Sequence, residues 1–310
     1  DASRLCKRCE SLHAKEMGTD WLGSRIYRPS QLDFLEGSRH KIDKQTHYFK
    51  KFRYPKSGGF EKYASLLEKN SNFNLEEEVY EIDLSKKTVK TKTGETYTYN
   101  TLINTMPLPI FLNRCLQTKE KLSEEINLLD CSKLFLINIE VPAPRKRSDN
   151  WIYVYDENLL STRINFIESL SINNTPEGYS GIQVEVYING KNKLESTKSE
   201  LGSLILDEMV TMGLIDAKIL PDCKYSIVEV PWANVIFNLT TKQSLEKIWN
   251  ELTQWGLVRE AQDTNPISDW EKEKKQKTLG SLIMNGRFGQ WKYFWTDDCI
   301  LRGKQIGDII

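Results

Sequence analysis

The 310-residue chain is long enough for one large or two moderate domains, which excludes small disulfide-stabilised scaffolds. Hydrophobic residues make up 39% and charged residues 28%, a composition typical of a chain that buries a core and not of a disordered one. Lys plus Arg and Asp plus Glu both number 43, so the net charge is zero and we expect no nucleic-acid partner. Because no apolar run is long enough to span a bilayer and no signal peptide is recognisable, we expect a cytoplasmic protein.

The six cysteines fit a reducing compartment better than a disulfide framework. Cys6-x-x-Cys9 and His13 would lie on nearly one face of a helix, but the sequence offers no second ligand pair. We therefore interpret them as ordinary thiols and expect no metal site. The other four cysteines are isolated: Cys115, Cys131, Cys223 and Cys299.

The first third of the chain predicts few long elements. Residues 1–13 have an amphipathic helical pattern, and residues 8–45 are mainly polar and rich in turn formers. The turn Tyr54-Pro55-Lys56-Ser57-Gly58-Gly59 precedes a predicted helix over residues 60–67. Three short strands then follow, at about 73–82, 87–92 and 95–99, and the tight turns between them predict a β-meander.

The rest of the chain alternates between strand and helix patterns. Residues 101–105 form a short predicted strand that Pro107 and Pro109 end. The fold class that this alternation indicates is α/β, in part α+β. Further elements are expected as strands at 133–141, 151–155, 161–168, 182–188, 224–230 and 279–287, and as helices at 197–212, 242–256 and 297–308.

Three stretches together resemble the superfamily of FAD-dependent amine oxidases and protoporphyrinogen oxidases. They are the turn ending in Gly58-Gly59 with its helix and β-meander, the segment Leu102-Ile103-Asn104-Thr105-Met106-Pro107, and the closing segment from Gly286-Arg287 to Asp297-Asp298. Within that superfamily the sequence is most similar to protoporphyrinogen-oxidase-like proteins and UDP-galactopyranose mutases. Arg25-x-x-Arg28-Pro29 and Thr162-Arg163-Ile164 resemble features of the mutases.

The resemblance implies an organisation into a flavin domain and a substrate domain. Residues 51–110 and 279–310 would form the remaining part of an FAD-binding domain, residues 1–50 a helical and loop part of the substrate region, and residues 111–278 a mixed-sheet substrate domain. FAD would be the cofactor. The G-x-G-x-x-G turn that holds the pyrophosphate in such proteins is absent from this sequence, so we expect the NAD(P)-binding Rossmann-like half to lie upstream of residue 1.

The resemblance also implies a set of cofactor-contacting residues. The glycine at the end of the last strand would let the backbone approach the flavin, the following arginine would pair with a phosphate, and the helix after it would direct its N-terminus at the flavin. An ordinary strand-end turn followed by a capped helix has the same sequence pattern. The expected cofactor residues are Val79, Thr105, Pro107, Gly286, Arg287, Trp291, Asp298 and Cys299.

The substrate would be a small molecule, and a nucleotide sugar if the mutase resemblance holds. Expected substrate residues are Arg25, Arg28, Gly58, Gly59, Arg163 and Tyr293, with the three arginines converging on an anionic group and no carboxylate between them. No catalytic residue is identified, because the three histidines lack triad partners. The first hypothesis is an amine-oxidase-type oxidoreductase that transfers hydride to flavin. The alternatives are a mutase-like isomerase and a non-catalytic remnant.

Overall fold

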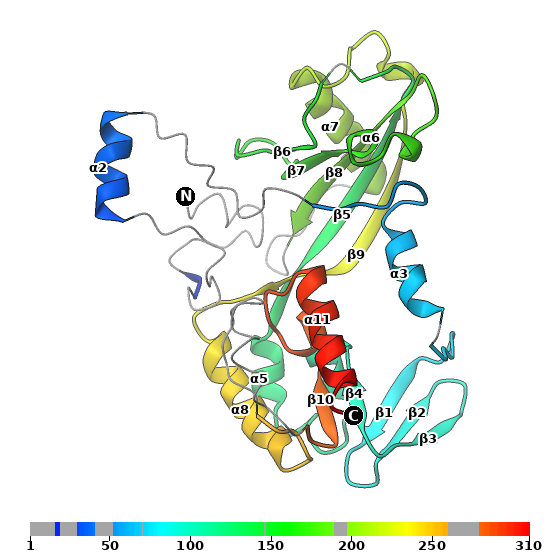
Figure 1. The fold of residues 1–310 in the computed structure, drawn as a ribbon, viewed down its shortest axis with the longest axis vertical. Helices are drawn as coiled ribbons and strands as arrows, with labels where there is room; N and C mark the ends of the chain where they lie inside the picture. Colours follow the sequence, from blue (N-terminus) through cyan, green and yellow to red (C-terminus); the bar gives the residue numbers. More distant parts are fainter. Residues whose placement is uncertain are drawn as a thin grey trace. The chain divides into compact units, whose positions relative to one another are not determined.

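The structure is a computed structural model that describes residues 16–18, 30–40, 52–69, 71–145, 147–188, 197–259 and 279–310. The chain divides into two compact units, which are treated separately below. Unit 1 consists of Asp1–Met17, Arg53–Glu76 and Asp130–Asn238, and unit 2 of Gly18–Phe52, Glu77–Leu129 and Leu239–Ile310. The α/β class expected from the sequence, in part α+β, is confirmed (Figure 1).

The division differs from the expected boundaries at residue 18 and at the described residues of 30–40, 53–76, 111–129 and 239–259, and side-chain contacts accompany the last three segments. Residues 53–76 join unit 1, where the carbonyl oxygen of Lys56 accepts hydrogen bonds from Ser171 Oγ and from Asn173 Nδ2, the latter at 3.0 Å. Residues 111–129 and the described residues 239–259 join unit 2, where Lys247 Nζ lies 2.8 Å from Glu125 Oε1.

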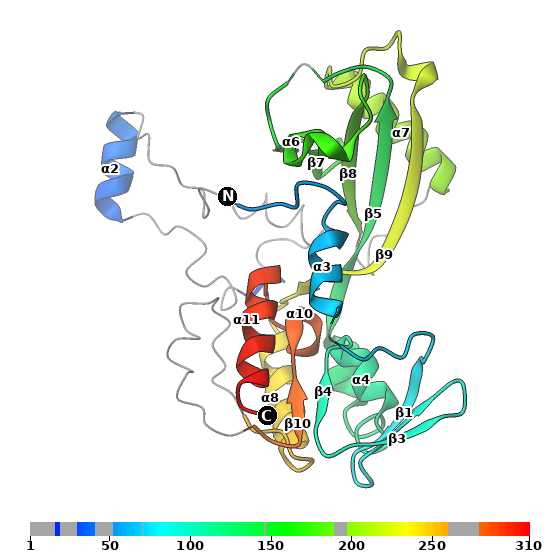
Figure 2. The same ribbon diagram turned by 45° about the vertical axis from the view of Figure 1, so that its right-hand side comes forward.

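Unit 1 is built on an antiparallel five-stranded sheet in the order β6-β7-β8-β5-β9. Its long strands β5, β8 and β9 run side by side in Figures 1 and 2. All five were predicted, β5, β8 and β9 with shorter bounds and β6 and β7 with longer ones. The strands are β5 (Asp130–Val141), β6 (Trp151–Tyr153), β7 (Arg163–Phe166), β8 (Ser180–Ile188) and β9 (Lys224–Ile236).

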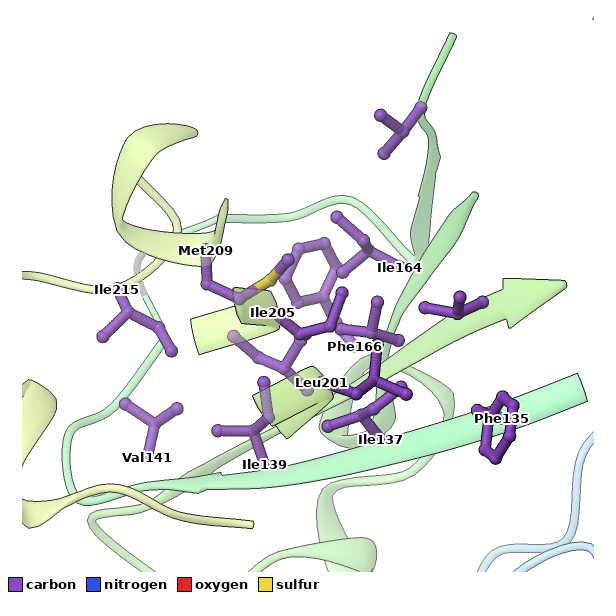
Figure 3. Packing of buried hydrophobic residues seen from close by; sticks show 14 residues of the cluster. Phe135, Ile137, Ile139, Val141, Ile164, Phe166, Leu201, Ile205, Met209 and Ile215 are labelled. Atoms are coloured by element: carbon purple, nitrogen blue, oxygen red, sulfur yellow. The ribbon is translucent and has the colours of Figure 1, made fainter. Parts of the chain in front are cut away.

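Helix α7 (Lys198–Thr211) supplies the apolar partner of one face of this sheet. Alternate residues of β5, from Phe135 to Val141, point toward Leu201, Ile205 and Met209 of the helix (Figure 3). The helix begins with a capping box, in which Thr197 Oγ1 accepts from the Glu200 amide at 3.3 Å and Glu200 Oε2 accepts from the Thr197 amide at 2.6 Å. The sequence predicted this helix correctly.

The remaining helices of unit 1 are short. The predicted helix after the Gly58-Gly59 turn is α3 (Glu61–Glu68), but it buries no side chain, and Leu66 and Leu67 are 53% and 57% exposed. The others are α6 (Ile167–Leu170), η3 (Ile172–Asn174) and η4 (Leu220–Asp222).

Unit 2 contains the predicted β-meander, formed by β1 (Val79–Asp83), β2 (Thr88–Thr91) and β3 (Thr96–Thr98). The β1–β2 turn is held by the carboxylate of Asp83. Its Oδ1 accepts from Ser85 Oγ at 2.6 Å, from the Lys86 amide at 3.1 Å and from Gln117 Nε2 at 2.8 Å. These hydrogen bonds favour the ionised carboxylate, so the pKa of Asp83 falls to about 2.

A second, parallel strand pair in unit 2 joins β4 (Leu102–Asn104) to β10 (Leu282–Met284). Figures 1 and 2 show the two strands side by side, with α11 alongside them. The two strands are separated by about 180 residues of chain, so tertiary folding alone brings them together. The described helices of this unit are α2 (Gln31–Arg39), α4 (Leu108–Arg114), α5 (Ser123–Leu128), α8 (Thr241–Thr253), α10 (Gly286–Gly289) and α11 (Thr296–Gly307).

Sequence reasoning missed several of the helices. Residues predicted as turn-rich include α2 (Gln31–Arg39), which starts at a capping box between Ser30 and Asp33. Helices α4 and α5 were missed because each is shorter than two full helical repeats. The predicted helix at 1–13, with Cys6, Cys9 and His13, lies outside the described residues. Among the described helices, none combines the length and apolar character needed to cross a bilayer.

Candidate functional site

The candidate cofactor segment, defined as residues 285–302, begins where β10 ends beside β4. Leu282, Ile283 and Met284 pair in register with residues 102–104. One residue further on, the Asn285 amide donates to the Asn104 carbonyl at 2.9 Å. The side chain of Asn104, which is 3% exposed, closes the end of β4 by accepting from the Met106 amide at 3.1 Å. The ends of both strands are therefore fixed at the same place.

Two glycines allow the backbone to turn at this point. Gly286 has a φ of +81°, which glycine adopts without strain, and a Cβ built on it would meet no atom within 4 Å. At Gly289, in contrast, there is no room for a side chain, because an added Cβ would lie 2.8 Å from the Asn104 carbonyl oxygen. Gly286 therefore borders open space, while Gly289 lets α10 approach the end of β4. The sequence analysis identified Gly286 but not Gly289.

Arg287 is held in place by its own segment. Its Nε donates to the Phe294 carbonyl at 2.6 Å, and its guanidinium carbon lies 5.1 Å from the centroid of the Tyr293 ring. The Lys292 amide donates to the Arg287 carbonyl at 2.9 Å and closes the loop. Arg287 and Tyr293, expected on the cofactor and the substrate respectively, are thus brought together.

Trp291 departs from ordinary geometry in two ways. Its φ is +52°, in the left-handed region, and its side chain is 1% exposed. The indole Nε1 is buried and has no hydrogen-bond partner within the described structure. Phe294, three residues on, is equally buried and contributes no such polar atom.

The start of α11 carries two more of the expected residues. The capping residue is Trp295, whose amide donates to Asp298 Oδ2 at 2.7 Å. Asp298 is fully buried. Burial raises the pKa of the neighbouring Cys299 thiol, and the backbone amide and guanidinium of Arg287 oppose that rise.

Arg302 is a feature of this segment that the sequence analysis missed. It lies four residues after Asp298, on the same face of α11, and is 3% exposed. Burial lowers the pKa of its guanidinium to about 10. The spacing of Asp298 and Arg302 in an amphipathic helix is the signal that could have identified it.

Thr105 and Pro107 lie directly after β4. Thr105 is exposed. Pro107 is the N-cap of α4: it has no amide hydrogen to donate, and its carbonyl oxygen accepts a hydrogen bond from the Phe111 amide at 3.0 Å. Val79 lies elsewhere in unit 2, at the start of β1, where its carbonyl accepts from Arg114 Nη1. The same guanidinium donates to Glu78 Oε1 at 2.8 Å through Nη2.

Arg163 lies in unit 1, on the sheet face opposite the apolar core. Its Nη2 pairs with Glu185 Oε1, so Arg163 has a compensating carboxylate. The expected convergence of Arg163 with Arg25 and Arg28, which lie outside the described residues, stays a prediction. Tyr187 donates to the other oxygen of Glu185 at 2.9 Å, and Asn165 Nδ2 lies 3.4 Å from Oε1. The side chain of Glu185 is 4% exposed and that of Arg163 is 29% exposed, so the arginine is the accessible member.

The cross-strand register explains this cluster. Tyr153, Arg163 and Glu185 are opposite one another on β6, β7 and β8, and antiparallel partners that face each other project from the same side of a sheet. No sequence pattern identifies Glu185 or Tyr187 as neighbours of Arg163, because neither the strand order nor the register can be read from the residues.

The other expected substrate residues are only partly located. Gly58 and Gly59 have φ values of +83° and +63° and form the predicted turn in unit 1. Arg25 and Arg28 lie outside the described residues. The described residues hold no cluster of three or more His, Cys, Asp or Glu placed to bind a metal ion.

Unit 1 also contains an open pocket of about 970 Å³ that the sequence did not predict. It lies between the loop after β5 and the segment from α6 to β8, and Arg145, Asn150, Glu168, Asn173 and Tyr179 are among its lining residues. Arg145 Nη1 and Glu168 Oε1, 3.8 Å apart, are nearly buried behind it. None of the expected site residues lines this pocket.

Comparison with solved structures identifies the fold. A reduced UDP-galactopyranose mutase superposes with a TM-score of 0.73 and 18% identity, over 94% of this chain and 58% of the mutase. A protoporphyrinogen oxidase-like protein from Exiguobacterium sp. 255-15 superposes with a TM-score of 0.50 and 14% identity, over 64% of this chain and 44% of the other. The chain therefore has the fold of these proteins, as the sequence resemblance implied, and spans little more than half of the mutase. No protein-family model and no curated protein matches it.

Proposed function

We propose that this chain provides flavin-contacting and substrate-contacting residues of an FAD-dependent enzyme, and that the enzyme is an isomerase of nucleotide sugars similar to UDP-galactopyranose mutase. The observation that carries the proposal is the extent of the fold similarity, which covers 94% of this chain for the mutase. Because each unit is far larger than the uncovered remainder of the chain, the similarity includes residues of both units.

The residues of the candidate cofactor segment fit a flavin dinucleotide. Gly286 borders open space, Arg287 is fixed by the Phe294 carbonyl, and α11 begins next to both. In a helix of this length the amides of the first turn have no partners within the helix, and this end carries a partial positive charge. Both properties favour the binding of an electron-rich group at the start of α11. The buried and unbonded Trp291 Nε1 supplies a further donor without a partner.

The protein residues would act by binding and orientation. Bound FAD would supply the electron-transfer or covalent chemistry, for which no side chain of the described residues is otherwise suited. Arg287 would neutralise a phosphate of the cofactor. On unit 1, Arg163 would present its guanidinium to polar groups of the substrate, with Glu185 and Tyr187 fixing its orientation.

An amine-oxidase-type oxidoreductase is the second candidate. Its support is the similarity to the protoporphyrinogen oxidase-like protein, which extends over 64% of this chain. The two candidates differ in the fate of the substrate. An isomerase returns a product at the same oxidation level, whereas an oxidoreductase removes a hydride from the substrate and leaves reduced flavin.

The test uses the intact protein, with any sequence that precedes residue 1 or follows residue 310. FAD and UDP affinities are measured by titration, and UDP-galactose is then incubated with the protein, FAD and a chemical reductant. The isomerase predicts UDP binding and a product of equal mass that separates from UDP-galactose by chromatography.

Three other results would contradict this proposal. FAD binding without any affinity for UDP would favour the oxidoreductase, above all if a substrate bleached the flavin absorbance. UDP binding without turnover would rule out the isomerase reaction. Absence of FAD binding would favour the non-catalytic remnant.

A further inference from the structure

Trp291, in the candidate cofactor segment, combines two features that are each energetically unfavourable in a folded protein. Its φ of +52° is left-handed, a conformation that bulky side chains adopt only where the surrounding structure enforces it. Within the described structure only Glu76 and Lys87 share this property among residues other than glycine, and both lie in or next to turns. Trp291 also lies in a turn, just after α10, but it is 1% exposed, whereas Glu76 and Lys87 are exposed.

The second feature is its indole N–H. Tryptophan has a single donor and no acceptor, so a buried Nε1 either finds one acceptor or loses its hydrogen bond to water without replacement. In the described structure Trp291 Nε1 finds none. Phe at this position would fill much of the same apolar space without that penalty.

The position of Trp291 connects both features with ligand binding. It lies four residues after Arg287 and four before Trp295, the residue that caps α11. The Lys292 amide donates to the Arg287 carbonyl, so the backbone next to the strained residue closes the loop that fixes Arg287. Strain and an unsatisfied buried donor are both typical of sites that a ligand completes.

We propose that the Trp291 indole N–H donates a hydrogen bond to an acceptor oxygen of bound FAD, and that the flavin-free protein keeps this donor unpaired. The inference rests on the proposed FAD function and adds to it one specific donor. A purely structural Trp291 would contribute to stability in the flavin-free protein and leave the cofactor affinity unaffected.

The test compares Trp291→Phe with Phe166→Leu in the intact protein. Trp291→Phe should lower FAD affinity about 3- to 10-fold, the range for one hydrogen bond, while the flavin-free protein unfolds at nearly the same temperature. Phe166→Leu removes apolar packing from an equally buried ring in the core of unit 1, outside the candidate cofactor segment, so it should lower the unfolding temperature and leave FAD affinity within about 2-fold.

A second measurement requires no substitution. With the eight tryptophans labelled by ¹⁵N, at least one indole N–H resonance should move downfield when FAD saturates the protein, as expected for a donor that gains an acceptor. The proposal is overturned if Trp291→Phe binds FAD as tightly as the unsubstituted protein, or if no indole resonance moves downfield at saturation. If the unsubstituted protein binds no FAD at all, the proposed function fails first.

Discussion

At the scale of single residues, the closing segment combines groups that the sequence identified with groups that only the structure reveals. Gly286, Arg287 and Asp298 were expected from the resemblance, and the structure places the first two in α10 and Asp298 in the first turn of α11. Gly289 and Arg302 were not expected. Their importance depends on neighbours, namely the Asn104 carbonyl and the burial of α11, that are distant in sequence.

Arg287 gives the most direct test of the cofactor segment. Arg287→Ala should weaken FAD binding by about 1.5–3 kcal/mol, roughly 10- to 150-fold, because a charged hydrogen bond to phosphate is lost. Arg287→Lys should recover only part of this, because an ammonium lacks the planar pair of donors. The measurement is a titration followed by flavin fluorescence.

Lys304→Ala provides the matched control for this arginine, because it removes an exposed cation from the last turn of α11. It should leave FAD affinity unchanged. Equal affinities of Arg287→Ala and the unsubstituted protein would show that Arg287 does not contact the cofactor.

Asp83 predicts a dependence of stability on pH. Its folded-state pKa of about 2 lies below the ordinary value of 3.8. The stabilisation that its ionised carboxylate adds to the free energy of unfolding is therefore present above pH 4 and is lost as the pH falls toward 2. From that shift the contribution is about 2 kcal/mol. Asp83→Asn should therefore lower the free energy of unfolding at pH 7 and flatten its decline between pH 4 and 2, as measured by urea denaturation. Asp207→Asn, at an exposed carboxylate of α7 outside its first turn, should do neither.

At the scale of elements, the strand pair β4–β10 and the turn into α10 depend on close backbone contact. Parallel strands so short gain little from their own hydrogen bonds, so the pair needs the contacts of α10 and α11.

Similarly, α5 and α8 are joined by buried carboxylates, Glu125 with Lys247 and Glu251 with Lys121. The elements of unit 2 are therefore stabilised by contacts that are long-range in sequence.

Gly289→Ala tests the contact between α10 and β4. An added Cβ would lie 2.8 Å from the Asn104 carbonyl oxygen, which is backbone and cannot move without displacing β4. We expect a loss of about 1–3 kcal/mol in the free energy of unfolding, the range for overpacking, and a parallel loss of FAD affinity. Gly307→Ala makes the same chemical change where the Cβ meets no atom within 4 Å, and it should not destabilise the protein. Similar unfolding curves for both variants would contradict the close approach.

At the scale of the whole molecule, the two units carry different parts of the proposed function. Unit 2 holds the candidate cofactor segment and unit 1 holds Arg163 with its polar partners. The similarity to the fold of the mutase includes both units.

Arg163→Ala distinguishes the two candidate enzymes. In an isomerase of nucleotide sugars the substitution should lower UDP affinity about 10-fold or more in the intact protein, and the difference should shrink at high salt, which screens the remaining charges. In an amine-oxidase-type enzyme UDP binding should be undetectable both before and after the substitution. Arg147→Ala is the control, because Arg147 is an exposed arginine of the same unit and pairs with Asp149 at 2.7 Å.

The sequence by itself determined the class of fold, most strands and long helices, and the resemblance to flavin proteins. Apolar periodicity shows which face of α7 is buried, and prolines and glycines mark where β4 and β10 end, because these are local properties of the chain. Only the tertiary structure decided which distant elements meet. The pairing of Arg163 with Glu185, the approach of Gly289 to Asn104 and the unbonded donor of Trp291 each depend on strand order, register or burial, none of which is encoded by neighbouring residues alone.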